Sequence, residues 1–235
     1  STCGLTVIIP AFNEEGDLAS CVSRVPSLED RLEIVIVNDG STDRTAAVAD
    51  EIRRTDQRVR VIHLPENQGK TAAIKAGIEA ARLPFVLIQD ADMTVAPECI
   101  PEFYRTLTAH PGAFITGTRF LRPMEPGAMP RRNRIANRLT ARILSRLFGC
   151  RLTDTLCGTK AFEKKLPVEF SGCRWPDLDL LLTACRRKIP VIEVPVSYVA
   201  RKHGESKMRF YPDAWQLFKQ IGGIAAGSIT ERFSR

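Results

Sequence analysis

Two aspartates, Asp90 and Asp92, stand one residue apart at the end of an apolar stretch that reads FVLIQ. A charge at the end of a buried strand is costly unless it is paired, so these carboxylates need a partner. Carboxylate oxygens suit Mg²⁺ or Mn²⁺, which leave coordination positions open for the phosphates of a substrate. A turn or a helix cap can use the same residue types, and the pair alone does not separate the two uses. In the company of the clusters described next, we expect Asp90 and Asp92 to be metal ligands.

Three further polar clusters each follow a predicted strand. They read PAFNE at residues 10–14, NDGSTD at 38–43 and NQGK at 67–70. In open α/β sheets, ligands bind at the carboxyl ends of the strands, so the four clusters should meet at one edge of one sheet. The sequence therefore predicts a single site assembled from four loops.

Individual residues of these clusters point to nucleotide chemistry, and each also has a plain structural use. Asp39 can accept a hydrogen bond from a base or a ribose, or it can shape a turn. Glu14 faces a nucleoside from the first loop, or it is an ordinary acid in the first turn of a helix. Lys70 lies near donor phosphates or in solvent. A P-loop is excluded, because that motif requires glycine where this chain has Leu64, and no GxGxxG motif follows a strand.

The elements that carry these clusters alternate between β-branched runs and helix-like segments, which is typical of βαβ units with a mostly parallel sheet. Strands are predicted at residues 5–10, 33–39, 59–64, 85–90, 112–120 and 190–199. Helices are predicted at 15–26, at 41–54 with Ser41 or Thr42 as the N-cap, at 70–82 and at 211–224. A chain of 235 residues, 44% of them hydrophobic, can bury one sizeable core, so we predict a single α/β domain.

A strongly basic segment follows the predicted strand at 112–120. Residues 119–151 contain nine arginines and a single acid, Glu125. From Arg134 to Arg146, arginines recur every four residues beside an apolar row, which predicts a basic amphipathic helix. Such a helix suits the anionic headgroups of a membrane surface, although a solvated face of a core helix shows the same pattern. No aromatic side chains interleave these arginines, which disfavours nucleic acid as a partner.

The overall composition is consistent with an anionic partner. The formal net charge of +7 fits a phosphate-bearing ligand or an anionic membrane. Seven scattered cysteines without a CxxC motif, and only three histidines, indicate neither a disulfide framework nor a zinc site, so we expect reduced thiols in a cytoplasmic protein. No stretch approaches the roughly 18 apolar residues that a membrane-spanning helix needs, so we expect peripheral attachment to the cytoplasmic face of a membrane.

Together, the four clusters and their spacing resemble glycosyltransferase family 2, whose members have the GT-A fold. The resemblance continues through GTRF at 117–120, DTLCGTKAF at 154–162, the segment 177–196 and RKHGESK at 201–207, and so covers nearly the whole chain. Within the family, the last three blocks are similar to the polyprenol-phosphate (dolichol-phosphate) mannosyl- and glucosyltransferases. The resemblance implies a nucleotide diphosphate sugar as donor, a polyprenyl phosphate or other lipid as acceptor, and Mg²⁺ or Mn²⁺ as cofactor.

On the donor side, the resemblance assigns a role to each matching residue. Nucleoside contacts are expected from Pro10, Phe12, Glu14 and Asp39. Asp90 and Asp92 would serve the metal and the diphosphate, with the backbone of Ala91 near the ribose. Arg201 and Lys207 would lie on a loop that closes over the donor phosphates, near which Lys70 adds a positive charge.

On the acceptor side, Arg119 together with Arg134 or Arg138 would receive the acceptor phosphate, because a guanidinium fork matches phosphate geometry. Two positions depart from the family. Thr94 stands where this branch commonly has Gln, and its shorter hydroxyl can touch a metal through water. Asp179 stands where the family usually has Glu.

We therefore expect inverting transfer of a hexose from UDP-glucose or GDP-mannose to a polyprenyl phosphate. Residues 1–118 would bind the donor and 119–210 the acceptor, and the helix within 211–235 would contact the membrane, the sheet or a partner subunit. Two alternatives stay open. A hydroxyl acceptor would require a general base, for which Asp154 or Asp179 is a candidate. The second alternative is a non-catalytic module that binds nucleotide sugar or membrane, and the Asp-x-Asp pair argues against it.

Overall fold

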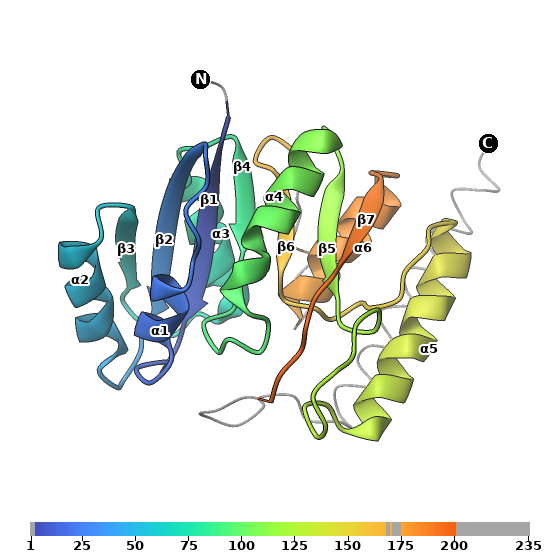
Figure 1. The fold of residues 1–235 in the computed structure, drawn as a ribbon, viewed down its shortest axis with the longest axis horizontal. Helices are drawn as coiled ribbons and strands as arrows, with labels where there is room; N and C mark the ends of the chain where they lie inside the picture. Colours follow the sequence, from blue (N-terminus) through green and yellow to red (C-terminus); the bar gives the residue numbers. More distant parts are fainter. Residues whose placement is uncertain (1–2, 168–169, 171–174, 201–235) are drawn as a thin grey trace.

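The computed structural model describes residues 3–167, 170 and 175–200. The predicted helix at 211–224, and Arg201 and Lys207 of the predicted closing loop, lie outside the described residues. One sheet of seven strands runs through the described part of the chain (Figure 1). Its strands are β1 (Gly4–Ala11), β2 (Arg31–Asp39), β3 (Val59–Leu64), β4 (Phe85–Ile88), β5 (Phe114–Thr118), β6 (Lys160–Glu163) and β7 (Val191–Pro195).

The strand order is β3-β2-β1-β4-β6-β5-β7. β6 is antiparallel to both β4 and β5, and every other pair is parallel. Because β6 opposes both of its neighbours, β4 and β5 run in the same direction and their carboxyl ends lie at the same edge of the sheet. The predicted boundary at residue 118 follows β5, yet β6 from further along the chain lies between β4 and β5. The sheet therefore interleaves the two predicted halves.

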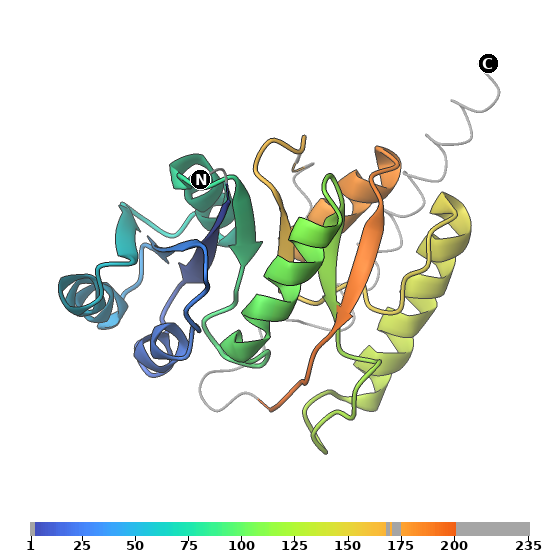
Figure 2. The same ribbon diagram turned by 45° about the horizontal axis from the view of Figure 1, so that its top comes forward.

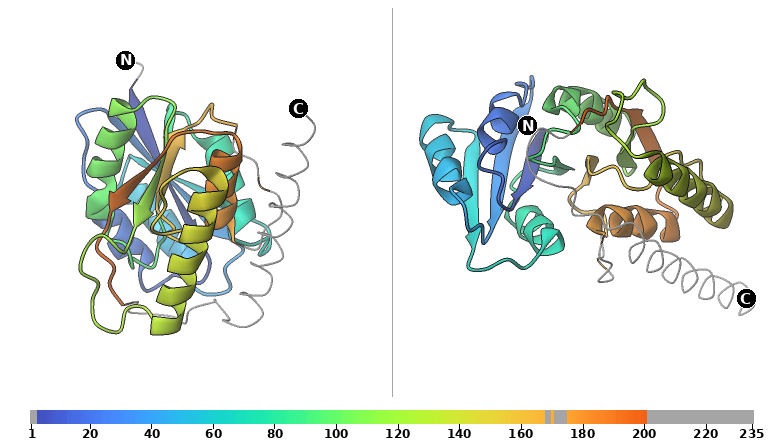
Figure 3. Two further views of the ribbon diagram at one scale, coloured as in Figure 1. Left: turned by 90° about the vertical axis from the view of Figure 1, so that its right-hand side faces the viewer. Right: turned by 90° about the horizontal axis from the view of Figure 1, so that it is seen from below.

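Helices cover both faces of the sheet, as parallel strands require. They are α1 (Leu18–Ser23), α2 (Thr45–Thr55), α3 (Lys70–Ala80), the 3₁₀ turn η1 (Pro97–Cys99), α4 (Ile100–Ala109), α5 (Arg131–Phe148) and α6 (Pro176–Arg186). Figure 3 shows α1 and α4 on one side of the sheet and α3 and α6 on the other. In Figures 1 and 2, α5 lies at the β7 end, far from α2.

The core is divided by the sheet into two apolar layers, one on each face. Along β1, Val7 and Ile9 pack into the layer of α1, α2 and α4, whereas Ile8 between them packs into the layer of α3, α5 and α6. All three side chains are fully buried. The near-continuous apolar strands of the sequence follow from this burial on both faces.

The structure corrects one predicted helix start. The helix that follows β2 begins at Thr45, with Arg44 as its N-cap, and neither Ser41 nor Thr42 caps it. Instead, the hydroxyl of Ser41 accepts a hydrogen bond from the backbone N–H of Asn13 at 3.0 Å. The prediction was wrong because this serine serves a tertiary contact between two loops.

Neither α4 nor β6 was predicted. The helix α4 buries Ile100, Phe103, Tyr104 and Leu107 on one face, so its amphipathic spacing was available in the sequence. The strand β6 has only four residues, and they include the fully buried Lys160. A strand this short, with a charge facing inward, leaves no periodic pattern to read.

Candidate functional site

The four polar clusters meet at the carboxyl edge of the sheet around one cavity of about 360 Å³. The lining residues are Pro10, Ala11, Phe12, Glu14, Asp39, Asn67, Gly69, Lys70, Ala73, Asp90, Ala91 and Asp92. Every predicted donor-side residue that the structure describes is among them. The cavity has room for part of a nucleotide sugar, and it is partly open to solvent. We call it the donor pocket.

Asp39 fastens one wall of the donor pocket. Its two carboxylate oxygens accept hydrogen bonds from the backbone N–H groups of Gln68 and Gly69, each at 2.8 Å. Gly69 has φ +89°, a conformation that favours glycine, and the next residue begins α3. Asp39 therefore shapes the loop that presents Lys70, and it lines the donor pocket.

The first loop is held against the loop after β2. The side-chain oxygen of Asn13 accepts a hydrogen bond from the backbone N–H of Thr42 at 2.9 Å, and the backbone N–H of Glu14 donates to the hydroxyl of Thr45 at 2.8 Å. Asn13 itself has φ +56°, in the left-handed region that asparagine tolerates better than most residues. These contacts keep Phe12 and Glu14 on the lining of the donor pocket.

Lys70 is the cation of the donor pocket, and two carboxylates hold it. Its Nζ lies 2.7 Å from Oδ1 of Asp90 and 2.9 Å from Oδ2 of Asp177. Burial alone lowers the pKa of Lys70, but the negative charges of Asp177 and Asp90 outweigh it and raise the pKa well above the ordinary lysine value. Burial raises the pKa of Asp177, with Lys70 opposing this shift. Lys70 is therefore fully charged at neutral pH.

Asp92 is oriented by the residue that departs from the family pattern. Its Oδ1 accepts hydrogen bonds from the backbone N–H of Thr94 at 3.0 Å and from the hydroxyl of Thr94 at 2.9 Å. Nearby, the amide of Gln89 donates to the carbonyl of Val95 at 2.8 Å and so braces the turn that carries both aspartates. The backbone and the hydroxyl of Thr94 thus both bind the carboxylate of Asp92.

Gly158 lies against the other aspartate. A Cβ atom at this position would collide with the carboxylate of Asp90, so only glycine lets the backbone pass this close. Gly158 belongs to the DTLCGTKAF block, which the sequence analysis did not connect with the Asp-x-Asp pair. A residue from the predicted acceptor half of the chain therefore packs directly against a predicted metal ligand.

The carboxylate oxygens of the pocket suit a hard cation, but they do not fill its coordination sphere. Asp90 and Asp92 both line the pocket and offer carboxylate oxygens, the donors that Mg²⁺ and Mn²⁺ prefer. Among the described residues, no group of three or more His, Cys, Asp or Glu side chains could hold a metal ion. Remaining coordination positions would therefore fall to water and to the phosphates of a ligand, as is usual for Mg²⁺.

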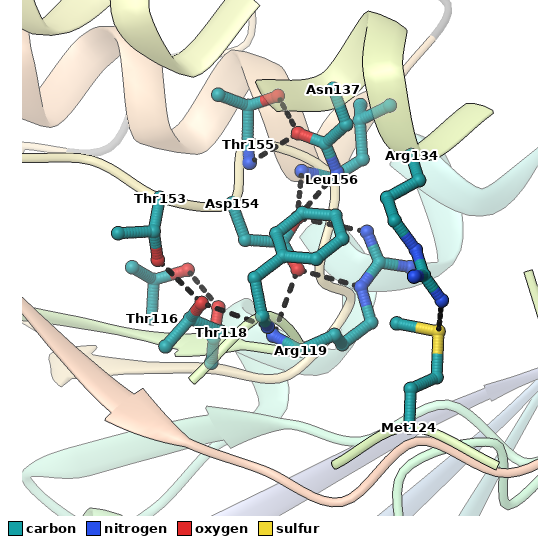
Figure 4. A network of polar contacts seen from close by, with 12 residues as sticks. Thr116, Thr118, Arg119, Met124, Arg134, Asn137, Thr153, Asp154, Thr155 and Leu156 are labelled. Atoms are coloured by element: carbon teal, nitrogen blue, oxygen red, sulfur yellow. Dashed lines mark hydrogen bonds and ion pairs between the residues drawn. The ribbon is translucent and has the colours of Figure 1, made fainter. Parts of the chain in front are cut away.

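Arg119, at the carboxyl end of β5, is bound to a buried carboxylate (Figure 4). Its Nε and Nη2 lie 2.6 and 2.8 Å from the two oxygens of Asp154, and its backbone N–H donates to the same group at 3.1 Å. Asn137 of α5 donates to Asp154 at 2.7 Å. Burial raises the pKa of Asp154, but the charge of Arg119 and the hydrogen bonds from Arg119 and Asn137 together outweigh it, so the pKa lies below its usual range. Asp154 is therefore an ionised anchor for Arg119 and α5.

The other two predicted acceptor residues project from α5. Nη2 of Arg134 contacts the sulfur of Met124 at 3.5 Å, and its buried Nε has no hydrogen-bond partner in the part of the chain that the structure describes. The guanidinium of Arg138 lies over the ring of Phe120 at 5.1 Å and is exposed. Neither arginine, nor Arg119, lines the donor pocket. An orphaned buried donor on Arg134 is the expected sign of a missing acceptor, which an anionic ligand could supply.

Neither candidate general base faces the donor pocket. Asp154 is fully buried and accepts hydrogen bonds from Arg119, Asn137 and the backbone N–H of Leu156. Asp179 is 2% exposed on α6 and is absent from the pocket lining. A base must come within hydrogen-bond reach of its proton, and these two positions do not favour that use.

The outward face of α5 is apolar as well as basic. Ile135 is 67% exposed and Leu139 is 48% exposed on adjacent turns, and Leu121 of the preceding loop is 53% exposed. Arg138, Arg142 and Arg146 are exposed on the same helix. Exposed large apolar side chains beside arginines suit the boundary between headgroups and acyl chains. None of the helices that the structure describes is long and apolar enough to cross a membrane.

Comparison with known proteins agrees with this arrangement. A model of glycosyl transferase family 2 matches residues 6–166 of the 235-residue chain. The chain belongs to glycosyltransferase family 2. The matched segment of this family 2 protein includes all four polar clusters of the donor pocket and the basic helix α5.

Curated relatives are named as enzymes that act on polyprenyl phosphates. The chain is 32% identical to a dolichyl-phosphate hexose transferase of Haloferax volcanii, over 92% of each chain. It is 33% identical to a polyprenol monophosphomannose synthase of Mycolicibacterium smegmatis, over 86% of this chain and 80% of that one. An undecaprenyl-phosphate 4-deoxy-4-formamido-L-arabinose transferase of Edwardsiella ictaluri is 31% identical, and there the chain spans only 62% of the relative's length. The predicted resemblance to the polyprenol-phosphate branch is confirmed.

Solved structures share the fold. Glucosyl-3-phosphoglycerate synthase from Mycobacterium tuberculosis, in complex with UDP, superposes with a TM-score of 0.71 over 93% of this chain and 80% of that chain. Because the sequence identity is 20%, this similarity supports the fold only. The predicted GT-A α/β fold is confirmed.

Proposed function

We propose that this family 2 glycosyltransferase transfers a hexose from a nucleotide diphosphate sugar, UDP-glucose or GDP-mannose, to a polyprenyl phosphate. One observation carries the proposal. The pocket at the carboxyl edge of the sheet contains the Asp90–Asp92 pair and the charged Lys70. Three arginines, one of them at the end of β5 and two on α5, lie outside its lining. A donor diphosphate suits the first group of side chains and an acceptor phosphate suits the second. The names of the relatives support the acceptor class.

In the proposed reaction, an oxygen of the acceptor phosphate attacks the anomeric carbon of the donor sugar. The bond from that carbon to the diphosphate breaks, and its electron pair leaves with the nucleoside diphosphate, so the configuration inverts. The attacking oxygen is already anionic and needs no general base. This agrees with the burial of Asp154 and Asp179 and disfavours the alternative of a hydroxyl acceptor.

The side chains then have three tasks. Phe12, Glu14 and Asp39 would contact the nucleoside, and the charged Lys70 would stabilise the departing diphosphate. Asp90 and Asp92 would hold Mg²⁺ or Mn²⁺, which when bound neutralises the negative charge that develops on the leaving group. A protein of the same fold, glucosyl-3-phosphoglycerate synthase, is described as a complex with Mn²⁺, UDP and glucosyl-3-phosphoglycerate, so this fold can bind a divalent metal together with a nucleoside diphosphate.

Acceptor binding is assigned to Arg134 and Arg138, with Arg119 as the buried member of the group. Within the described residues the Nε of Arg134 has no hydrogen-bond partner, while Arg138 is exposed and Arg119 is fixed by Asp154. The exposed Ile135 and Leu139 on the same helix would contact the membrane that contains the lipid. We place this surface on the cytoplasmic face, as the scattered cysteines and the family resemblance predict.

The test is transfer of labelled sugar to a polyprenyl phosphate, with UDP-glucose and GDP-mannose assayed separately in Mg²⁺ or Mn²⁺. Label in the organic phase that requires the metal and is lost in Asp92→Asn is the expected result. Binding of either donor without any labelled lipid would contradict the acceptor assignment. Binding of neither donor would contradict the function as a whole.

A further inference from the structure

Lys70 is held from two sides, and one of its partners has no place in the reaction described so far. Lys70 is the first residue of α3, and Asp177 lies in the first turn of α6, 107 residues further along the chain. Both oxygens of Asp177 accept from Nζ of Lys70, at 2.9 and 3.2 Å. The cation of the donor pocket is therefore fixed by a carboxylate from the other end of the sequence.

Asp177 can act on the donor only through Lys70. It does not line the donor pocket, and its side chain is 16% exposed. A second cation, Lys160 of β6, is fully buried and interacts electrostatically with Asp177. Nζ of Lys160 donates to the hydroxyl of Thr116 at 3.0 Å. Asp177 thus forms an ion pair with a cation that lines the pocket and interacts electrostatically with a fully buried one.

The arrangement matters when a donor arrives. Asp90 is a predicted metal ligand, yet its Oδ1 is in contact with Lys70, at 2.7 Å. For Asp90 to bind a metal, Lys70 must give up part of this contact, and a half-buried ammonium that loses a carboxylate partner is less stable. Asp177 keeps Lys70 paired while a metal replaces Lys70 on Asp90, and it holds the flexible lysine stem at the pocket.

We propose that Asp177 is a positioning residue, which holds Lys70 against the donor diphosphate and releases Asp90 for the metal. The proposal rests on the proposed donor site, and it adds a residue that the sequence analysis did not assign. Without the charge of Asp177, Lys70 pairs with Asp90 alone and competes with the metal for it. The effect should therefore appear on ligands with a diphosphate and not on nucleosides.

The experiment measures binding of UDP and GDP, each with Mn²⁺, to the full chain and to Asp177→Asn, Asp177→Glu, Lys70→Met and the Lys70→Met/Asp177→Asn double variant. Loss of one charge-assisted contact should weaken diphosphate binding roughly tenfold or more in Asp177→Asn, and Asp177→Glu should restore most of it. Binding of UMP or GMP should change little. In the double variant, diphosphate affinity should equal that of Lys70→Met, because Asp177 acts through Lys70.

Asp56→Asn is the matched control, since it removes a half-buried ion pair with Arg58 outside the donor pocket and should leave binding unchanged. If Asp177→Asn does not fold, Asp177→Glu is introduced into both the unaltered chain and Lys70→Met. Its small loss of diphosphate affinity should then occur only in the unaltered chain. Additive losses, or equal losses for UMP and UDP, would overturn the proposal. A chain that binds UDP or GDP but labels no lipid contradicts only the proposed reaction, and one that binds neither overturns both.

Discussion

At the scale of single residues, the site depends on how each carboxylate is oriented. Asp92 is aimed by Thr94, Asp90 lies between Lys70 and Gly158, and Asp39 fastens the loop before α3. None of these partners adjoins its carboxylate in the sequence, apart from Thr94. The replacement of one partner atom, such as the hydroxyl of Thr94, should therefore change the orientation of a carboxylate in the site.

Asp92→Asn should reduce transfer by roughly 10² to 10³, because it removes the negative charge that is proposed to hold the metal. The amide is the same size, so the fold should survive, as unfolding monitored by circular dichroism would show. Thr94→Val is the companion variant, since it keeps the backbone N–H to Asp92 but loses the hydroxyl at 2.9 Å. We expect a smaller loss there, roughly tenfold. Unchanged turnover in Asp92→Asn would remove the metal role.

Gly158→Ala should impair transfer by displacing the carboxylate of Asp90, with which the new methyl group would collide. Gly112→Ala is the control, because its Cβ would meet open space and only backbone strain at φ +78° would result. We expect both variants to lose some thermal stability, and only Gly158→Ala to lose turnover per folded molecule. Equal turnover in the two variants would show that Asp90 does not need its present position.

At the scale of elements, α5 combines two functions on one helix. Its buried side supplies Asn137 to the Arg119–Asp154 pair, and its outer side exposes Ile135, Leu139 and a row of arginines. The helix thereby joins the proposed acceptor site to the proposed membrane surface. Two double variants, one on the proposed acceptor site and one on the proposed membrane surface, separate these uses.

The double change Arg134→Ala/Arg138→Ala should raise the KM for polyprenyl phosphate by about tenfold or more and leave donor affinity nearly unchanged, since charge-assisted contacts to phosphate would be lost. Arg142→Ala/Arg146→Ala removes the same charge from the later part of the helix. That control should weaken attachment to anionic vesicles more than it affects use of a short-chain acceptor. Equal losses on donor and acceptor in the first variant would contradict the assignment.

The double change Ile135→Ser/Leu139→Ser should weaken binding to vesicles that contain anionic lipid, because two exposed apolar side chains leave the interface. Sedimentation with vesicles measures the effect, and a water-soluble short-chain acceptor tests the chemistry separately. Turnover on the soluble acceptor should be preserved. Unaltered sedimentation would show that this face of α5 does not contact the membrane.

At the scale of the whole molecule, donor and metal binding should be linked. The described residues provide the Asp90–Asp92 pair but no group of three or more His, Cys, Asp or Glu side chains that could hold a metal ion, so water and the ligand's phosphates would complete the coordination. A ligand that binds only the folded state raises the melting temperature. We therefore expect Mn²⁺ and UDP or GDP together to raise the melting temperature by more than the sum of their separate effects. Asp92→Asn should abolish the excess, and a simple sum in the unaltered chain would contradict shared coordination.

Much of this protein was determined by its sequence alone. The apolar runs at 5–10, 33–39, 59–64 and 85–90 identified the first four strands, and the polar clusters after them predicted the donor pocket, because parallel strands bring their carboxyl ends to one edge. The basic helix was predicted from its four-residue spacing and is present as α5. These features are periodic or local, so a sequence records them directly.

Only the tertiary structure decided how distant segments meet. The antiparallel β6 between β4 and β5 brings Gly158 against Asp90, and α6 brings Asp177 to Lys70. Arg119, predicted only as a phosphate ligand, is paired with Asp154 in the buried network under α5. No local pattern encodes these contacts, because each depends on how the strands are ordered in the sheet and on which groups burial leaves in need of a partner.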